Sequence, residues 1–200
     1  MGVRLQPLHA PLPALAPRSG SALGRAFGRL ILRLGGWRMR GSFPDVAKMM
    51  IIVAPHSSGW DAVWGLAMKL ALGLDAAFMA KAELFRGPLG WLLRRFGGFP
   101  VDRSSTAGVV EQAAQRFHER EICWLVLAPE GTRRRVEHWK SGFWRIARAA
   151  DVPVLCVYFH YPERVIGIGP LLDTSDSLEQ DMARVREFYR PWLGRNRGTF

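Results

Sequence analysis

A histidine and an aspartate five residues apart are the first pair of side chains that could do chemistry: His56 and Asp61, in the run His-Ser-Ser-Gly-Trp-Asp. On a continuous α-helix this spacing turns the two side chains about 140° apart, so they could not touch. They can meet if His56 precedes a helix whose first turns contain Asp61, with Ser57 or Ser58 capping that helix. The carboxylate would then hold one imidazole nitrogen and leave the other to accept a proton. A general base is one interpretation; a histidine that only solvates or caps the end of a strand is the other.

Neither serine of this segment has the surroundings of a nucleophile. A serine hydrolase would use Ser57 or Ser58 with a distant histidine, but the chain contains no Gly-x-Ser-x-Gly turn of the kind that presents such a serine. A base that is held by a carboxylate, without a nucleophile of its own, suits the activation of a hydroxyl group on a substrate.

A second polar cluster, Pro-Glu-Gly-Thr-Arg-Arg-Arg, contains Glu130, Gly131, Thr132 and Arg133 and comes directly after an apolar run. Gly131 allows close approach to the backbone, and Thr132 can cap a turn or donate a hydrogen bond. The guanidinium of Arg133 can bind a phosphate or a carboxylate through two parallel hydrogen bonds. A charged surface turn would explain the two arginines that follow, but an acid beside arginines at the end of a strand indicates an ion network around Glu130.

Two more basic side chains stand near short apolar pieces. Arg103 follows Gly-Gly-Phe-Pro-Val-Asp and could add a second phosphate contact, and Lys81 lies in Ala-Lys-Ala-Glu-Leu-Phe. Each alone could equally be an ordinary surface residue. The segment Val152-Pro153-Val154 begins an apolar run and is mainly structural, since proline costs little at the start of a strand.

Apolar runs alternate with segments of helical periodicity from residue 46 onward, which is typical of an α/β protein. The predicted strands are 49–54, 122–127 and 152–159, and the predicted helices are 61–74, 90–96, 107–120, 143–150 and 177–189. The pattern favours a single domain with a central, mostly covered β-sheet flanked by helices. The polar clusters follow strands, where such sheets commonly carry function.

The composition suits one compact domain, with 200 residues of which 48% are hydrophobic. Cys123 and Cys156 lie inside apolar runs, so neither a disulfide framework nor a metal site is expected. The net charge of +11 indicates an anionic partner: nucleic acid, an anionic lipid surface or a phosphorylated substrate. A nucleic-acid-binding protein without catalysis is the distant alternative, but no recognition helix or aromatic-studded sheet supports it.

The basic charge is concentrated near the N-terminus, where residues 1–50 hold eight basic side chains and one acid. Residues 21–40 have apolar positions at helical spacing, including Phe27 and Trp37, opposite a row of arginines. Such a helix can lie in a bilayer interface with its arginines at anionic headgroups, although an ordinary surface helix is equally consistent with the pattern. The apolar positions are Leu23, Phe27, Leu30, Ile31, Leu34 and Trp37, and the arginines are Arg25, Arg29 and Arg33.

Three segments follow from these patterns. Residues 1–20, rich in proline and alanine, are expected to form a flexible leader, and residues 21–45 an amphipathic membrane-association segment. Residues 46–200 are expected to form the catalytic domain.

Four segments, in this order, resemble the four motifs of the glycerolipid acyltransferase family, whose bacterial members make phosphatidic acid from lysophosphatidic acid. The first motif, His-x-Ser-x-x-Asp, is matched by His56, Ser58 and Asp61, and the second, a glycine followed by an extended apolar piece and an arginine, is matched by Gly98 and Arg103. The third motif, Pro-Glu-Gly-Thr-Arg, is matched by residues 129–133, and the fourth, Val-Pro-aliphatic, by residues 152–154. The resemblance extends from about residue 48 to 170. Any one motif is weak, but four in register are specific.

The resemblance implies a glycerol-3-phosphate acyltransferase-like fold and O-acyltransferase chemistry. His56 would be the general base and Asp61 its orienting partner. The base would deprotonate the free hydroxyl of a lysophospholipid, foremost 1-acylglycerol-3-phosphate, or of glycerol phosphate. That hydroxyl would attack the thioester of acyl-CoA or an acyl carrier protein. The family's reaction implies no covalent acyl-enzyme and needs no metal or organic cofactor.

The same resemblance implies the substrate-binding residues and the place of action. Lys81, Arg103 and Arg133 would hold the acceptor phosphate. The residues expected to shape the acceptor site are Ser58, Glu130, Gly131 and Thr132. The expected partner surface is an anionic membrane, with the protein bound peripherally to the cytoplasmic face of a bacterial inner membrane and no nucleic acid involved.

Four positions depart from the usual family pattern: Pro55, Ala128, Arg134 and Cys156 stand where Asn, Phe, Ser and a second Pro are common. These changes leave the chemistry intact and concern the identity of the acceptor. A lyso-aminolipid acylated on a hydroxyl, such as a lyso-ornithine lipid, is therefore an alternative acceptor, while the retained Arg103 and Arg133 favour a phosphate.

Overall fold

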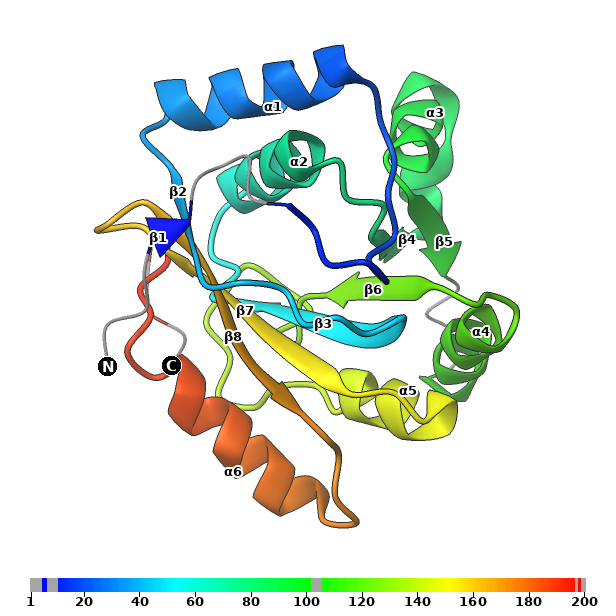
Figure 1. Cartoon of the computed structure of the whole chain (residues 1–200). Helices are drawn as coiled ribbons and strands as arrows, with labels where there is room; N and C mark the ends of the chain where they lie inside the picture. The colour runs from blue at the N-terminus through cyan, green and yellow to red at the C-terminus, as the bar shows by residue number, and fades with distance from the viewer. Residues whose placement is uncertain (1–4, 7–10, 102–105, 197, 199–200) are drawn as a thin grey trace.

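The computed structural model describes residues 5–6, 11–101, 106–196 and 198. In this part of the chain eight strands form one sheet in the order β1-β2-β8-β7-β3-β6-β4-β5 (Figure 1). The strands are β1 (Leu5–Gln6), β2 (Arg38–Arg40), β3 (Lys48–Ala54), β4 (Ala77–Lys81), β5 (Gly98–Val101), β6 (Cys123–Leu127), β7 (Val154–His160) and β8 (Val165–Leu172). The helices are α1 (Ala22–Leu34), α2 (Trp60–Leu72), the 3-10 helix η1 (Ala82–Phe85), α3 (Gly87–Arg95), α4 (Thr106–His118), α5 (Gly142–Ala150) and α6 (Leu178–Tyr189). The predicted α/β domain with a helix-flanked central sheet is confirmed.

The centre of the sheet is parallel. Strands β6 and β7 pair with β3 on its two sides, and β4 pairs with both β6 and β5. The carboxyl ends of these five strands therefore lie along one edge, the edge at which open α/β sheets bind ligands. Beyond β7, strand β8 returns antiparallel, and β2 lies parallel to β8.

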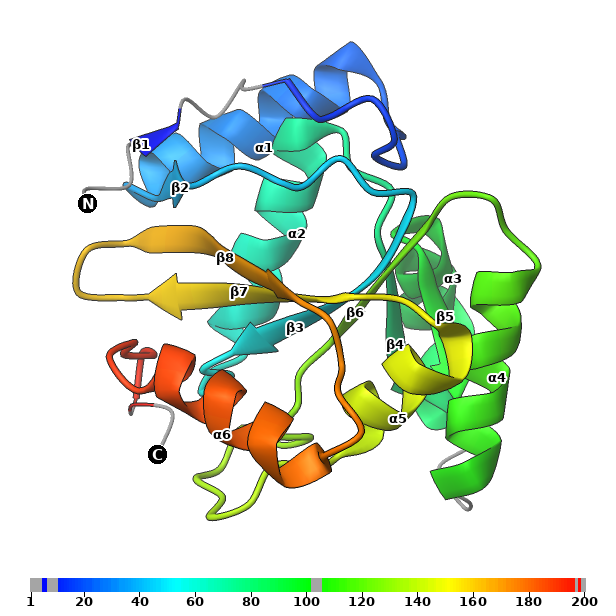
Figure 2. The ribbon, with the colours of Figure 1, turned by 60° about the horizontal axis from the view of Figure 1, so that its bottom comes forward.

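Helices cover both faces of the sheet (Figures 1 and 2). Alternate residues of β3 enter two different cores, as the pleat of a strand requires. Met50 and Ile52 pack in the core that contains residues of α4, α5 and α6, whereas Met49 and Ile51 pack in the core that contains residues of α1 and α2. This double burial explains why β3 reads as a continuous apolar run without polar alternation.

The sequence patterns predict three of these eight strands, β3, β6 and β7, and β4 and β8 are among the strands that they miss. Strand β8 contains Gly167, Gly169 and Pro170, residue types that are depleted in strands. Only glycine fits at position 167, because a Cβ there would lie 1.9 Å from Cζ of Tyr158 on the neighbouring β7. Gly167 weakens the strand pattern in the sequence, and it is required because β8 pairs with β7.

The N-terminal helix is shorter than predicted. Ser21 caps α1 by accepting a hydrogen bond from the N–H of Gly24, and the helix ends at Leu34, followed by Gly36 at φ +70°. The prediction of helix up to residue 40 is wrong, since residues 38–40 form β2. Trp37 lies outside the helix and is buried, with its ring 4.9 Å from that of Tyr161, so it is not part of an exposed apolar face.

One face of α1 packs closely on α2. A Cβ at Gly28 would lie 2.5 Å from the backbone nitrogen of Ala71, so only glycine permits this approach of the two helices. Leu32, one turn further on, is fully buried at the same interface. The contact decides which side of α1 faces the protein and leaves the opposite side to solvent.

The described residues of the predicted leader lie against the domain. The N–H of Ser19 donates to the carbonyl of Gly73, the N–H of Asp75 donates to that of Pro17, and Ala16 is buried. The division into leader, membrane-association segment and catalytic domain stays a prediction.

Candidate active site

His56 lies in the loop between β3 and α2, and Asp61 lies in the first turn of α2. The imidazole Nδ1 is 3.3 Å from Oδ2 of Asp61, so the two side chains meet in the way that their spacing allows. The same oxygen accepts hydrogen bonds from the N–H groups of Ser57 and Ser58, each at 2.8 Å. Asp61 therefore folds the loop back over the start of α2 and holds His56 beside it.

Capping of α2 differs in detail from the prediction. The N-cap residue is Gly59 and makes no side-chain cap, while Oγ of Ser58 accepts from the N–H of Trp60 at 3.2 Å. Ser58 is buried, and its contacts hold the loop.

A tyrosine that the sequence patterns do not single out completes the surroundings of Asp61. The hydroxyl of Tyr161 donates to Oδ1 of Asp61 at 2.5 Å. Tyr161 follows directly on β7, the neighbour of β3, which brings together residues 100 positions apart. The contact could have been anticipated only from the strand order, since nothing in the local sequence marks this tyrosine.

Asp61 is ionised although it is buried. Burial alone raises the pKa of a carboxyl group, but the hydrogen bonds from His56, Tyr161 and the N–H of Ser58 together hold the pKa of Asp61 below its usual value. The negative charge of the Asp61 carboxylate beside Nδ1 favours the tautomer of His56 that is protonated at Nδ1. It also stabilises the imidazolium that forms when Nε2 takes a proton. The pair can thus work as a general base.

Glu130 holds the backbone of His56. Its side chain is 1% exposed, and Oε1 accepts a hydrogen bond of 2.6 Å from the backbone N–H of His56. Gly131 follows at φ +66°, a conformation that favours glycine, with a Cβ position 3.1 Å from the Lys140 side chain. The loop after β6 therefore positions the backbone of the loop after β3.

Arg133 reaches the start of α2 from this same loop. A Cβ atom built on Gly59 would lie 3.2 Å from Nη1 of Arg133, so the guanidinium lies against the N-cap residue of the helix. Thr132 accepts a weak hydrogen bond from the N–H of Arg134 at 3.3 Å and is half-buried. The loop after β6 thus brings Glu130 and a cation to the segment that contains His56 and Asp61.

The remaining predicted residues lie farther along the same edge. Lys81 is the exposed last residue of β4, which is two strands from β3 and therefore roughly 10 Å away across the sheet. Arg103 is among the residues that the structure does not describe; β5, which precedes it, ends at Val101 beside Lys81.

Comparison with known proteins identifies the family. A family model described as Acyltransferase matches residues 40–160, more than half of the chain, and this range contains all of the site residues that the sequence predicts but not Tyr161. The chain belongs to this acyltransferase family.

Two named proteins illustrate what this chain is similar to. A 1-acyl-sn-glycerol-3-phosphate acyltransferase of Streptococcus pneumoniae is 31% identical over 127 residues, which are 62% of this chain and 47% of that protein. The chain spans about half the length of this curated relative. The crystal structure of the 1-acyl-sn-glycerophosphate acyltransferase PlsC of Thermotoga maritima has a TM-score of 0.62 at 20% identity, covering 83% of this chain and 75% of that one, and has the same fold.

Two residues beyond the family match also touch the candidate site. Asn196 donates from its side-chain amide to the carbonyl of Ser57 at 2.9 Å and from its backbone N–H to Oγ of Ser57 at 3.4 Å. Arg195 lies over the ring of Trp60, with Cζ 5.3 Å from the ring centroid. Sequence reasoning missed both residues, because a polar C-terminal stretch has no pattern that points to the start of α2.

Two negative findings concern the residues that the structure describes. None of their helices is long and apolar enough to cross a membrane. Among these residues no group of three or more His, Cys, Asp or Glu side chains is arranged to hold a metal ion.

Proposed function

We propose that this chain transfers a fatty acyl group from acyl-CoA or an acyl carrier protein to the free hydroxyl of 1-acylglycerol-3-phosphate, giving phosphatidic acid. The observation that carries the proposal is the oriented base: Nδ1 of His56 lies 3.3 Å from the buried Asp61, at the edge of the sheet where Arg133 supplies a cation. The names of the relatives support the same acceptor.

The chemistry assigns one role to each partner of the pair. Nε2 of His56 takes the proton of the acceptor hydroxyl as its oxygen attacks the thioester carbon, and Asp61 stabilises the imidazolium. The tetrahedral intermediate then collapses, the carbon–sulfur bond breaks, and the proton passes from His56 to the departing thiolate. Because the acceptor oxygen is itself the nucleophile, we expect neither an acyl-enzyme nor a metal or organic cofactor.

The acceptor phosphate is assigned to the basic residues along the carboxyl edge of the sheet. Arg133 lies at the start of α2, while Lys81 and Arg103 are the proposed cations of the β4 and β5 ends. Glu130 and Gly131 shape this site by fixing the loop backbone, and Ser58 and Thr132 complete the turns beside it.

Acyl transfer can be tested with purified protein, a labelled acyl donor and a panel of lysolipids. We expect product with 1-acylglycerol-3-phosphate, and none when His56→Ala replaces the base while folding, checked by circular dichroism, is kept. Turnover by His56→Ala at the wild-type rate would refute the catalytic assignment. Product only with a lyso-ornithine lipid would replace the acceptor but keep the chemistry.

The role of Arg133 is tested separately. Arg133→Ala should raise the KM for the acceptor, by about 2–3 kcal/mol in apparent binding if the phosphate contact is bidentate. Arg135→Ala, two residues along the same exposed loop, is the matched control. A rise in the KM of the acyl donor alone would contradict the placement of Arg133 at the acceptor.

We further propose that α1 binds an anionic membrane surface. Four apolar side chains lie within an arc of about 60° on the helix face opposite α2 and are 52–82% exposed. An apolar stripe of this kind can enter the boundary between lipid headgroups and acyl chains. The stripe consists of Leu23, Phe27, Leu30 and Leu34.

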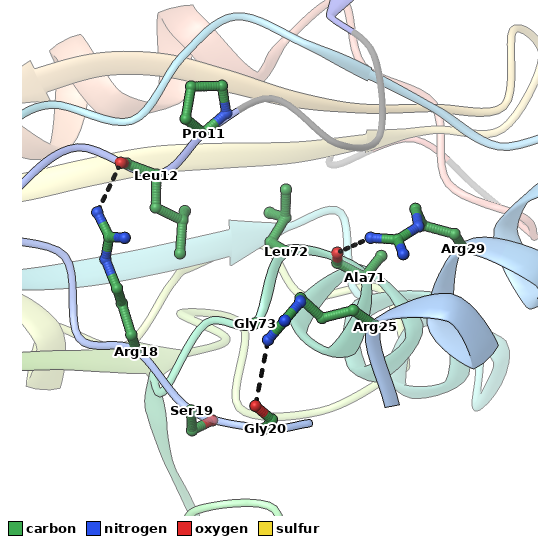
Figure 3. A pocket seen from close by; sticks show the side chains of 10 residues that line it. All are labelled: Pro11, Leu12, Arg18, Ser19, Gly20, Arg25, Arg29, Ala71, Leu72 and Gly73. Atoms are coloured by element: carbon green, nitrogen blue, oxygen red, sulfur yellow. Dashed lines mark hydrogen bonds between the residues drawn. The ribbon is translucent and has the colours of Figure 1, made fainter. Parts of the chain in front are cut away.

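A cavity of about 490 Å³ between residues 11–20, α1 and the end of α2 supports the same proposal (Figure 3). Its charged lining consists of Arg18, Arg25 and Arg29, each of which donates a hydrogen bond to a backbone carbonyl and keeps further donors. The cavity lies at the other end of α2 from His56, about 20 Å away along a 13-residue helix. Its positive charge suits the phosphate of a lipid headgroup next to the apolar stripe.

Vesicle binding tests the membrane proposal without reference to catalysis. We expect the protein to float with phosphatidylglycerol vesicles more than with phosphatidylcholine vesicles, and less at high salt. The double variant Phe27→Ser, Leu30→Ser should lose flotation, whereas Leu171→Ser, an exposed leucine on β8, should not. Equal flotation of both variants would show that α1 is not the membrane-binding element.

A further inference from the structure

The segment after α6 turns back onto the loop between β3 and α2, which contains His56. The N–H of Tyr161 donates to the carbonyl of Leu193 at 2.9 Å, and the N–H of Leu193 donates to Nδ1 of His160 at 3.2 Å. Three residues later, Asn196 makes its two hydrogen bonds to Ser57. Residues 193–196 are therefore tied at both ends to groups that adjoin His56 and Asp61.

Arg195 stands between these two attachments. Its guanidinium lies 5.3 Å from the ring centroid of Trp60, whose side chain is 48% exposed. In the part of the chain that the structure describes, no salt bridge joins Arg195 to a carboxylate. The pKa of Tyr161 is raised by burial first and then by Asp61, while Arg195 lowers it, as a positive charge near this pair must.

Arg133 brings a second positive charge to the same place. Its Nη1 lies beside Gly59, the residue before Trp60, and it too has no salt bridge within the described residues. Two guanidinium groups from distant parts of the chain thus lie against Gly59, the N-cap of α2, and Trp60, its first residue, next to the loop that contains His56. Two cations without a carboxylate are the arrangement that an anion with two charges would satisfy.

We propose that Arg195 and Arg133 together bind the terminal phosphate monoester of the acceptor, and that this pair selects a phosphomonoester over a phosphodiester lysolipid. The inference deepens the proposed function and rests on it. A phosphomonoester carries between one and two negative charges at pH 7 and three terminal oxygens, which can accept from two guanidinium groups at once. A phosphodiester has a single charge, and its substituent occupies one of those oxygens.

The position of Arg195 is prepared before substrate binds. Stacking on Trp60 limits the side chain, and the bonds of Asn196 to Ser57 limit the backbone, so little conformational entropy is lost when a phosphate arrives. Asn196 is a positioning residue in this scheme, because it acts through Arg195 and the loop.

The test compares Arg195→Gln with Arg195→Lys and with Arg190→Gln as the matched control. Arg190 is an exposed arginine at the end of α6 that pairs with Glu187. For Arg195→Gln we expect kcat/KM with a lysophosphatidic acid to fall about tenfold or more, and to change less than threefold with a lysophosphatidylglycerol. Arg195→Lys should recover part of the loss, and Arg190→Gln should behave as wild type. Thermal melting of each variant controls for folding.

Three results would overturn the inference: an equal loss with both acceptors, a rise only in the KM of the acyl donor, or no loss at all. If wild-type protein transfers no acyl group to any lysolipid, the proposed function fails, and calorimetric titration with glycerol 3-phosphate still tests the site. Weaker binding by Arg195→Gln but not by Arg190→Gln would support the phosphate site, and equal binding by all proteins would contradict it.

Discussion

Tyr161→Phe removes one hydroxyl and leaves the packing of the ring in place. The hydroxyl donates to the ionised, buried Asp61 at 2.5 Å, and the ring remains packed at 4.9 Å from that of Trp37. A hydrogen bond to a charged group contributes about 1.5–3 kcal/mol net, so the free energy of unfolding should fall by about that amount at pH 7. If about half of the 3 kcal/mol is lost from transition-state stabilisation because His56 is less well oriented, kcat falls about tenfold, since about 1.4 kcal/mol is a factor of ten.

The pH dependence of this loss identifies its origin. Hydrogen bonds hold the folded-state pKa of Asp61 below its usual value, so the carboxylate stabilises the fold at pH values above the unfolded pKa of about 3.9. That contribution is lost as the pH falls through the lowered folded pKa. The difference in stability between Tyr161→Phe and wild type should therefore be largest at neutral pH and shrink once Asp61 is protonated in both proteins.

Urea denaturation between pH 2.5 and 7.5 measures the stability, and steady-state kinetics measure kcat and the KM of the acceptor. Tyr158→Phe is the matched control, because Tyr158 is a buried tyrosine on β7 whose hydroxyl interacts with Arg40. Since Tyr161 acts through Asp61, its loss should lower kcat and leave the KM of the acceptor unchanged. A stability difference that does not vary with pH, or a kcat equal to wild type, would refute the reasoning.

Three further predictions rest on single contacts. Gly28→Ala should lower the free energy of unfolding by about 1–3 kcal/mol in denaturant titrations, because its Cβ would meet the backbone of Ala71 at 2.5 Å, whereas Gly142→Ala has open space and should cost nothing; equal stability of the two variants would contradict the packing of α1. Glu130→Ala should lower kcat more than Glu130→Gln, since glutamine keeps an acceptor for the His56 N–H. The same kcat for both variants would contradict a role of Glu130 in positioning His56. Asp61→Asn should flatten the acid limb of the stability–pH curve because it removes the carboxylate whose pKa is lowered; an unchanged acid limb would show that another group dominates.

Much of the fold follows from local patterns. The runs at β3, β6 and β7 are apolar because all three strands are central and covered on both faces, and such runs are recognisable without knowledge of tertiary structure. Strand β8 and the end of α1 are different, since long-range contacts produce their sequence features. Gly167 leaves space for the side chain of Tyr158. Position 37 holds an apolar residue because its side chain packs in the core, not because it belongs to the apolar face of a helix.

The candidate site divides in the same way. The meeting of His56 and Asp61 depends on six consecutive residues at a strand-to-helix junction, so the spacing predicts that the two side chains can meet there. Tyr161, Arg195 and Asn196 reach the site only because β7 lies beside β3 and because the chain after α6 turns back, and neither fact has a local signature. Predicting them requires the strand order.

The structure also explains how an ionised carboxylate can stay buried behind the histidine. Each oxygen of Asp61 has its own donors: the two loop N–H groups and Nδ1 of His56 at Oδ2, and the hydroxyl of Tyr161 at Oδ1. The desolvation cost of a buried charge is offset only when such donors are already in place, as they are here before any substrate binds. The imidazole of His56 is therefore oriented in advance. In the proposed reaction, substrate binding has only to bring the acceptor hydroxyl to Nε2, and that is the task assigned to the arginines at the start of α2.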